Sequence, residues 1–412
     1  MREIKKLTLE QLRPALLIGA KAYPMMPINT DEQLNERVEY FSKDFGKHGR
    51  EWYGLFENGI MLGIMVLFDF KLHYYTRSIK ARGIGFVAVD FLHKKQKVCK
   101  EMLSWFLQDS VTQKYPLAML HAFRPDFYKR MGFGYGTMCD KYVSSPERFP
   151  HYETTLSPYY LDYRNRKEVM DFYNELYYTY HGMVRKNQAS VDTLLNLPGL
   201  ESVGFYDYGK LCALLHFRLT ANEATEQATH MDMELLFTSP EGLKAALSFL
   251  NSQSDQVSRI NFSTFDPQLF YSFSDIRHLD GKSLREPAFH HTTDNGMGIM
   301  YRSLDHVYLI THKPCTLDKF SIRFVLQDDF CPNGMKEFCI RWNKGKARLS
   351  KSSIYDVELK LRVADFASWV MNCIDLDTLY LYGLLDTNDK YVLSTLDAAF
   401  YFPGKPRCLE RF

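Results

Sequence analysis

The chain lacks most of the features that mark special classes of protein. Its 412 residues carry a formal net charge of only +2, so no overall field indicates nucleic acid as a partner. No apolar run approaches the length of a membrane span, and the N-terminal apolar stretch is broken at Arg13-Pro14, which argues against a signal peptide. These absences predict a cytoplasmic protein that binds neither a membrane nor nucleic acid.

Cysteines are also few, and they are scattered. The eight cysteines form no CxxC pair, and no Cys/His set has the spacing of a zinc site. Cysteines this dispersed are mostly small buried hydrophobic residues in a reducing compartment. What remains is an ordinary globular composition, with 46% hydrophobic residues, in a chain long enough for about two to four domains.

The stretch 84–107 carries the most informative pattern. An apolar strand ending at Val89 runs into a basic loop, His93–Lys97, and then into an amphipathic helix that begins at Val98. The unpaired N–H groups of a first helical turn attract anions, so this arrangement suits the pyrophosphate of coenzyme A. On the pattern alone, an ordinary βα unit with a solvated basic loop is the simpler interpretation.

The elements around this stretch predict the order ααβββαβαβ over residues 1–140. Thr30-Asp31-Glu32-Gln33 has the form of a capping box, and Asn58-Gly59 is a two-residue hairpin signal. The expected elements are a helix at 8–20, a helix from Thr30, strands at 52–57, 60–67 and 82–89, a helix at 98–107 and a strand at 117–123.

The region 150–290 resembles a degenerate copy of residues 1–140. A hairpin about Tyr208-Gly209 is followed by a strand at 231–237, a helix that begins with Ser239-Pro240, and a strand at 260–265. This copy has no basic loop, so we expect it to bind no phosphate. Two βα units that share an order by chance are an alternative.

A polar, turn-rich segment then leads into a region of different pattern. The adjacent His290 and His291 lie in this segment, but no third ligand has useful spacing, so a solvated linker is the simpler interpretation and no metal is expected. Alternating strands follow near 322–326, 338–342 and 357–363, and helices are expected at 366–370 and 393–402.

Two motifs taken together resemble the GNAT N-acetyltransferases, and most closely their enhanced intracellular survival subfamily. They are the strand and loop VAVDFLHKKQKV and, some way downstream, FYKRMGFGYG. The resemblance implies an α+β chain of tandem GNAT-like mixed α/β domains, the second degenerate, followed by a sterol-carrier-protein-like α/β domain. The implied ranges are 1–150, 151–290 and 291–412.

The resemblance also implies roles for single residues, with acetyl-CoA as co-substrate and no metal. Tyr128 matches the tyrosine that protonates the leaving thiolate, and the α-carboxylate of Phe412 matches the base that takes a proton from the substrate amine. The backbone of one strand would hold the pantetheine arm, namely Phe86, Val87, Ala88 and Val89. The loop and first helical turn would hold the pyrophosphate, namely His93, Lys94, Lys95, Gln96, Lys97, Val98 and Cys99.

These roles suit acetyl transfer, which needs a base for the amine and an acid for a poor leaving group. Without the resemblance, Tyr128 is simply an aromatic core residue ahead of a turn, and Phe412 a docked hydrophobic end. The sequence departs from the family pattern in three places: Lys97 stands where the loop usually has Gly, Asp90-Phe91 replaces a small residue and Pro, and Arg411 precedes the last residue.

Acidic residues provide a candidate site for the acceptor. Asp31, Glu32 and Glu36 on the second helix, with Glu410, would attract a cationic amine, although a solvated helix face explains the helical residues more simply. We therefore expect an acetyl-CoA-dependent N-acetyltransferase acting on a primary amine of a small cationic or lysine-type acceptor.

The alternative is a non-catalytic GNAT-fold protein that binds a ligand or partner through an impaired acetyl-CoA site. Lipid binding by the C-terminal domain is a third hypothesis, which rests on fold resemblance alone. The resemblance further implies a homo-oligomer, either a trimer or a hexamer.

Overall fold

The computed structural model describes residues 1–23, 26–221, 229–285, 288–331, 336–410 and 412. The chain divides into two compact units. The first joins Met1–Gly136 to Ile299–Phe412, and the second is Thr137–Gly298. Within the described residues, no helix is long and apolar enough to cross a membrane.

The first unit contains a seven-stranded sheet in the order β1-β2-β3-β4-β5-β16-β6, in which only β4 and β5 are parallel neighbours. Its strands are β1 (Arg2–Lys6), β2 (Arg50–Glu57), β3 (Ile60–Tyr74), β4 (Arg77–Val89), β5 (Leu117–His121), β6 (Gly134–Tyr135) and β16 (Ile299–Ser303). Asn58 and Gly59 both have positive φ at the predicted β2–β3 turn, as a two-residue hairpin requires.

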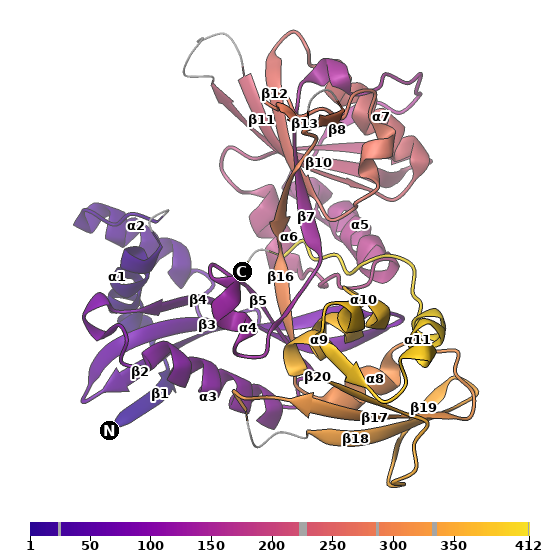
Figure 1. Ribbon diagram of the computed structural model, residues 1–412. Helices are drawn as coiled ribbons and strands as arrows, with labels where there is room; N and C mark the ends of the chain where they lie inside the picture. The colour runs from indigo at the N-terminus through magenta and orange to yellow at the C-terminus, as the bar shows by residue number, and fades with distance from the viewer. Residues whose placement is uncertain (24–25, 222–228, 286–287, 332–335, 411) are drawn as a thin grey trace. The chain divides into compact units, whose positions relative to one another are not determined.

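Helices cover both faces of this sheet (Figure 1). They are α1 (Leu12–Ala22), α2 (Asp31–Ser42), α3 (Val98–Thr112) and the short α4 (Pro125–Lys129). Thr30 caps α2 as predicted, with its hydroxyl oxygen 3.2 Å from the Gln33 nitrogen. The reciprocal bond of the capping box differs, because the Gln33 side chain accepts from Asn29 rather than from Thr30.

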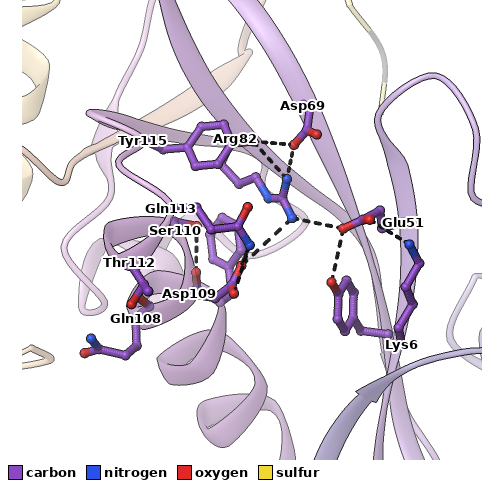
Figure 2. Close-up of polar contacts among 12 residues, drawn as sticks. Lys6, Glu51, Asp69, Arg82, Gln108, Asp109, Ser110, Thr112, Gln113 and Tyr115 are labelled. Carbon is purple, nitrogen blue, oxygen red and sulfur yellow. Dashed lines mark hydrogen bonds and ion pairs between the residues drawn. The ribbon is translucent and has the colours of Figure 1, made fainter.

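A buried arginine links the sheet to α3 (Figure 2). Arg82 is only 1% exposed, and its guanidinium pairs with Asp69 of β3, Glu51 of β2 (3.3 Å) and Asp109 of α3 (3.9 Å). The Tyr115 hydroxyl donates to the same Asp69 carboxylate at 2.7 Å. A buried cation is tolerated only when it is paired. This network therefore fixes the C-terminal half of α3 against strands β2, β3 and β4.

The C-terminal part of the first unit holds a five-stranded sheet in the order β19-β18-β17-β20-β21. Its elements are α8 (His306–His312), β17 (Phe320–Gln327), β18 (Glu337–Asn343), β19 (Lys346–Ser350), β20 (Val357–Arg362), α9 (Val363–Val370), α10 (Leu376–Leu381), β21 (Leu385–Thr387) and α11 (Leu393–Ala399). The helix predicted at 393–402 ends at Ala399, shortly before Pro403, which cannot continue a helix.

The second unit repeats the connectivity of the first sheet. Its sheet order is β15-β7-β12-β11-β10-β9-β8, and a helix joins the parallel pair β11 and β12 just as α3 joins β4 and β5. The elements are β7 (Met138–Ser144), β8 (Pro158–Tyr160), α5 (Arg166–Thr179), α6 (Gln188–Leu195), β9 (Glu201–Asp207), β10 (Lys210–Ala221), β11 (Thr229–Phe237), α7 (Pro240–Asn251), β12 (Val257–Thr264), the hairpin β13 (Ser283–Arg285) and β14 (Phe289–His290), and β15 (Asp294–Met297).

Three strands belong to a different sheet from the one that domain boundaries at 150 and 290 would give them. Strand β7 pairs with β12 and with β15, so residues 138–144 and 294–297 lie in the second sheet. Strand β16 pairs with β5 and β6 in the first sheet. The polar segment near residue 290 was expected to be a linker, but strand pairing extends on either side of it.

Candidate active site

A bulge in β4 distorts the strand at the centre of the candidate site. Ala88 pairs with Ile64 and Gly85 pairs with Val66, so two residues of β4, Phe86 and Val87, face one residue of β3. Phe86 has φ of +49°, which costs a residue with a Cβ about 1–2 kcal/mol. Its ring stacks on Tyr23 at 5.0 Å, and it packs against Gly19, where any side chain would collide with it.

Strands β4 and β5 stop pairing shortly before this bulge. Within the described residues, their parallel ladder ends at Gly83 and Met119, whereas Ala88 and Val89 still pair with β3. Within the described residues, the 84–89 stretch of β4 therefore has β3 along one edge and no strand partner along the edge that β5 would occupy. One of its groups is satisfied locally, because the Tyr23 hydroxyl donates to the Val87 carbonyl at 3.3 Å.

The basic loop adopts an unusual backbone conformation before α3. Lys95 (φ +65°) and Lys97 (φ +63°) both lie in the left-handed region that favours glycine. Lys97 is the N-cap of α3 but makes no capping bond, and within the described part of the chain the N–H groups of Val98 and Cys99 have no hydrogen-bond acceptor. Uncapped N–H groups beside left-handed residues are the donors of an anion site.

The corresponding turn of the second unit is different. Ser239 caps α7, and its hydroxyl oxygen accepts from the Gly242 nitrogen at 3.1 Å. That helix start has its own acceptor, and the turn 237–239 before it contains no lysine. Both features agree with the expectation that the second copy binds no phosphate, which stays a prediction.

Charged side chains surround the loop. Lys97 is exposed, and the Lys94 ammonium lies 3.4 Å from the centre of the Phe91 ring. The negative charge of Asp90 is engaged, because its carboxylate accepts from the Leu92 nitrogen (2.9 Å) and lies 3.7 Å from the Lys21 ammonium. His93 ends a short 3₁₀ turn, and the Gln96 carbonyl accepts from Arg2 at 2.9 Å. The loop therefore keeps a net positive charge.

Tyr128 is buried near the end of the short helix α4, among aromatic rings. It is 3% exposed, and the rings of Phe123, Phe127 and Phe133 meet it edge-on at 5.3–6.1 Å. Burial raises the pKa of Tyr128 well above the ordinary value of a phenol, and the nearby Cys99 and Tyr23 raise it further. The hydroxyl group therefore keeps its proton over the whole physiological range.

The last residue packs directly on β4. A methyl group placed at Gly85 would lie 2.7 Å from the carboxyl carbon of Phe412, so only glycine leaves room for this group. The Phe412 ring packs against Phe70 (4.9 Å) and His121 (5.1 Å). His121 also donates from Nε2 to the Glu410 carbonyl at 2.8 Å. Arg411 lies outside the described residues.

The predicted acceptor residues are spread over the surface. Asp31 pairs with Arg13 at 2.9 Å, and Glu32 and Glu36 are exposed on α2 without an ion pair in the described residues. This arrangement matches the simpler interpretation, a solvated helix face. The Phe412 ring contacts the aromatic rings of Phe68, Phe70 and His121.

Sequence reasoning missed Tyr23 and His121. Tyr23 stacks on Phe86 and donates to the Val87 carbonyl in the bulge, and His121 donates to the Glu410 carbonyl of the C-terminal segment. Tyr23 stood next to a proline-rich break, and His121 was one residue of a short apolar strand. No local signal distinguishes either residue, because each acts on a partner at least 64 positions away.

Two family models match separate parts of the chain. Residues 3–136 match the acetyltransferase (GNAT) domain, and residues 311–409 match the sterol carrier protein domain. No curated protein sequence matches the chain. The predicted fold class is confirmed, with a GNAT domain at the N-terminus and a sterol carrier protein domain at the C-terminus.

Solved structures share the fold over the full length. A probable N-acyltransferase from Enterococcus faecalis V583 is 18% identical with a TM-score of 0.80, and each chain is covered completely. A GCN5-related N-acetyltransferase from Anabaena variabilis is 14% identical, with 99% of each chain covered and a TM-score of 0.80. Eis1 from Mycobacterium abscessus is 17% identical over 100% of both chains, with a TM-score of 0.76. At these identities the likeness shows the fold alone.

Proposed function

We propose that this chain, whose first domain is a GNAT acetyltransferase domain, transfers an acetyl group from acetyl-CoA to a primary amine of a small cationic or lysine-type acceptor. One observation carries the proposal: the carboxyl group of Phe412 lies against β4 at Gly85, within the stretch of this strand that β5 no longer pairs. The proposed acid, Tyr128, is buried with its pKa raised by burial and by the neighbouring Cys99 and Tyr23. The Tyr23 hydroxyl in turn donates to the Val87 carbonyl of the same strand.

The proposed reaction uses each group once. The Phe412 carboxylate takes a proton from the ammonium form of the acceptor, and the neutral amine attacks the thioester carbonyl. Attack gives a tetrahedral intermediate whose nitrogen still carries one extra proton. As the C–S bond breaks, the Tyr128 hydroxyl gives its proton to the departing thiolate, and the Tyr128 oxygen regains a proton from that nitrogen, which leaves the amide, the free thiol of coenzyme A and a neutral Tyr128. The loop 93–97 and the N–H groups of Val98 and Cys99 would hold the pyrophosphate of coenzyme A.

Acetyl-CoA should bind one site per chain with micromolar affinity in isothermal titration calorimetry, and thiol release should appear when a primary amine is added. The assay is a panel of polyamines, aminoglycosides and lysine peptides, each corrected for hydrolysis without acceptor. Acetyl-CoA that shows no heat at high micromolar concentration would contradict the enzyme hypothesis. Binding without release for any amine would favour the second function below.

Two substitutions at Lys97 separate the effect of its charge from the effect of its backbone. Lys97→Ala removes the ammonium group but keeps a Cβ at positive φ. Lys97→Gly removes the ammonium group and the Cβ. We expect Lys97→Gly to be about 1 kcal/mol more stable than Lys97→Ala in chemical denaturation, because glycine relieves the left-handed strain.

The same pair should differ in binding acetyl-CoA. Loss of one exposed cation weakens binding by roughly two- to fivefold in both variants, and Lys97→Gly should regain part of this because the pyrophosphate comes closer to the backbone. Equal dissociation constants for the two variants would mean that the Cβ does not crowd the phosphate.

A second candidate function is binding without transfer. It is favoured by the bond from Tyr23 to the Val87 carbonyl, since this bond occupies a backbone group that the pantetheine arm would use. In that case the chain holds a ligand or partner on a GNAT scaffold. Assembly as a homo-oligomer, lipid binding by the C-terminal domain, and the absence of nucleic-acid and membrane partners stay predictions.

A further inference from the structure

Three potential metal ligands meet within the second unit. They are His278, His291 and Asp294, and their nearest ligand atoms all lie within 4.8 Å of one another. The two imidazole rings stack at 4.2 Å, almost parallel. Asp294 Oδ1 lies 3.1 Å from His291 Nε2, and its other oxygen lies 3.8 Å from His278 Nε2.

The buried member of the cluster has an unused ring nitrogen. His278 is 8% exposed, and its Nε2 has no hydrogen-bond partner among the described residues although it points at Asp294. A buried polar atom without a partner is costly, so such an atom usually indicates a missing ligand or a functional role. The exposed Asp294 carboxylate can rotate toward it.

We propose that His278, His291 and Asp294 form a binding site for a divalent transition-metal ion, with Zn²⁺ as the best fit. Two imidazoles and a carboxylate are ligands that zinc commonly takes, and three protein ligands leave a fourth position for water. Ligand atoms around tetrahedral zinc are about 3.3 Å apart. Small rotations of the Asp294 and His291 side chains would therefore bring the three ligand atoms to this separation.

The site should be of moderate affinity. The Asp280 backbone N–H donates to His278 Nδ1 at 3.2 Å, which leaves the ring proton on Nε2 in the metal-free chain. Coordination through Nε2 moves this proton to Nδ1 and breaks the bond, a loss of about fivefold in affinity. We therefore expect a micromolar dissociation constant rather than the far tighter binding of a preformed zinc finger.

The three ligands come from separate segments. His278 precedes the hairpin β13–β14, His291 follows it, and Asp294 opens β15. The His278 N–H already donates to the His291 carbonyl at 2.8 Å, so the backbone brings the two rings together. A bound ion would close the base of this hairpin and stabilise the second unit.

The test is calorimetry with ZnCl₂ on the full chain after EDTA dialysis, together with thermal denaturation. We expect one saturable site of micromolar Kd and a higher melting temperature with zinc. His291→Asn and Asp294→Asn should each weaken this site at least about tenfold. The matched control is His290→Asn, because His290 is an exposed neighbour outside the cluster; it should stay within twofold.

Cobalt gives an independent readout, since Co²⁺ in a tetrahedral site absorbs visible light. That absorption should appear in the parent chain and in His290→Asn, and should be lost in the His291 and Asp294 variants. Absence of saturable zinc binding would overturn the proposal. So would unchanged binding in folded His291→Asn, or an equal loss in His290→Asn, because the ion would then lie elsewhere.

Discussion

Tyr128→Phe should lower kcat by about 10²–10⁴-fold while acetyl-CoA binds within about twofold of the parent chain. The substitution removes only the hydroxyl group, and the ring keeps its contacts with Phe123, Phe127 and Phe133. The hydroxyl makes no hydrogen bond within the described residues, so its removal should leave folding stability nearly unchanged. Thiol release at saturating acetyl-CoA measures kcat, and calorimetry measures binding.

Tyr23→Phe is the matched control, since it removes a second hydroxyl group from the same cluster. That hydroxyl binds the Val87 carbonyl, so its loss should change the affinity for acetyl-CoA more than kcat. If Tyr128→Phe kept the parent kcat, or if both variants lost the same amount, Tyr128 would not be the acid.

The pH dependence follows from the same residue. Because the pKa of Tyr128 is raised, the phenol stays protonated, and activity should not fall on its account between neutral pH and pH 9. The rate should instead rise with pH as more of the acceptor amine loses its proton. A decline with an apparent pKa below 9 would contradict Tyr128 as a protonated donor.

Adding one glycine after Phe412 should reduce kcat/KM for the amine by about 10²–10⁴-fold. The extension turns the carboxylate over Gly85 into a neutral amide and moves the new carboxylate by about 3.8 Å along the chain. No group at Gly85 then accepts the proton of the amine. Acetyl-CoA binding should be unchanged, because the loop 93–97 is not altered.

Phe412→Leu is the control for docking of the C-terminal segment. It keeps the carboxylate but loses ring contacts with Phe68, Phe70 and His121, which should cost about tenfold or less in rate. An extended chain with undiminished turnover would remove the carboxylate from the mechanism. A larger loss in Phe412→Leu than in the extended chain would show that the ring matters more than the charge.

Local chemistry explains what could be predicted from the sequence. Asn58-Gly59 takes positive φ with little strain, and Ser239-Pro240 combines an N-cap with a residue suited to the first helical position, so both turns were predictable within a few residues. Helix α5, which the expected elements did not include, has an equally local signal, since Val169, Phe172, Tyr173 and Leu176 follow helical spacing and are buried.

Tertiary contacts explain what could not be predicted. The positive φ of Phe86 is held by Tyr23 and by the glycine at position 19, neither of which is adjacent in sequence. In the same way, adjacency in the sequence pairs His291 with His290, whereas the fold pairs it with His278. Spacing rules capture ligands on one helix or turn, and they fail when a hairpin separates the ligands.

The position of β16 affects how the chain is made. This strand lies between β5 and β6 in the sheet, yet it follows the whole second unit in the sequence. A ribosome that adds 5–20 residues per second therefore needs roughly 10–30 s to synthesise the second unit before it reaches β16. Until then the nascent first sheet has an open edge at β5, which is a template for wrong pairing. The acetyltransferase domain is thus complete only late in translation, and a fragment cut at residue 136 would carry that exposed edge permanently.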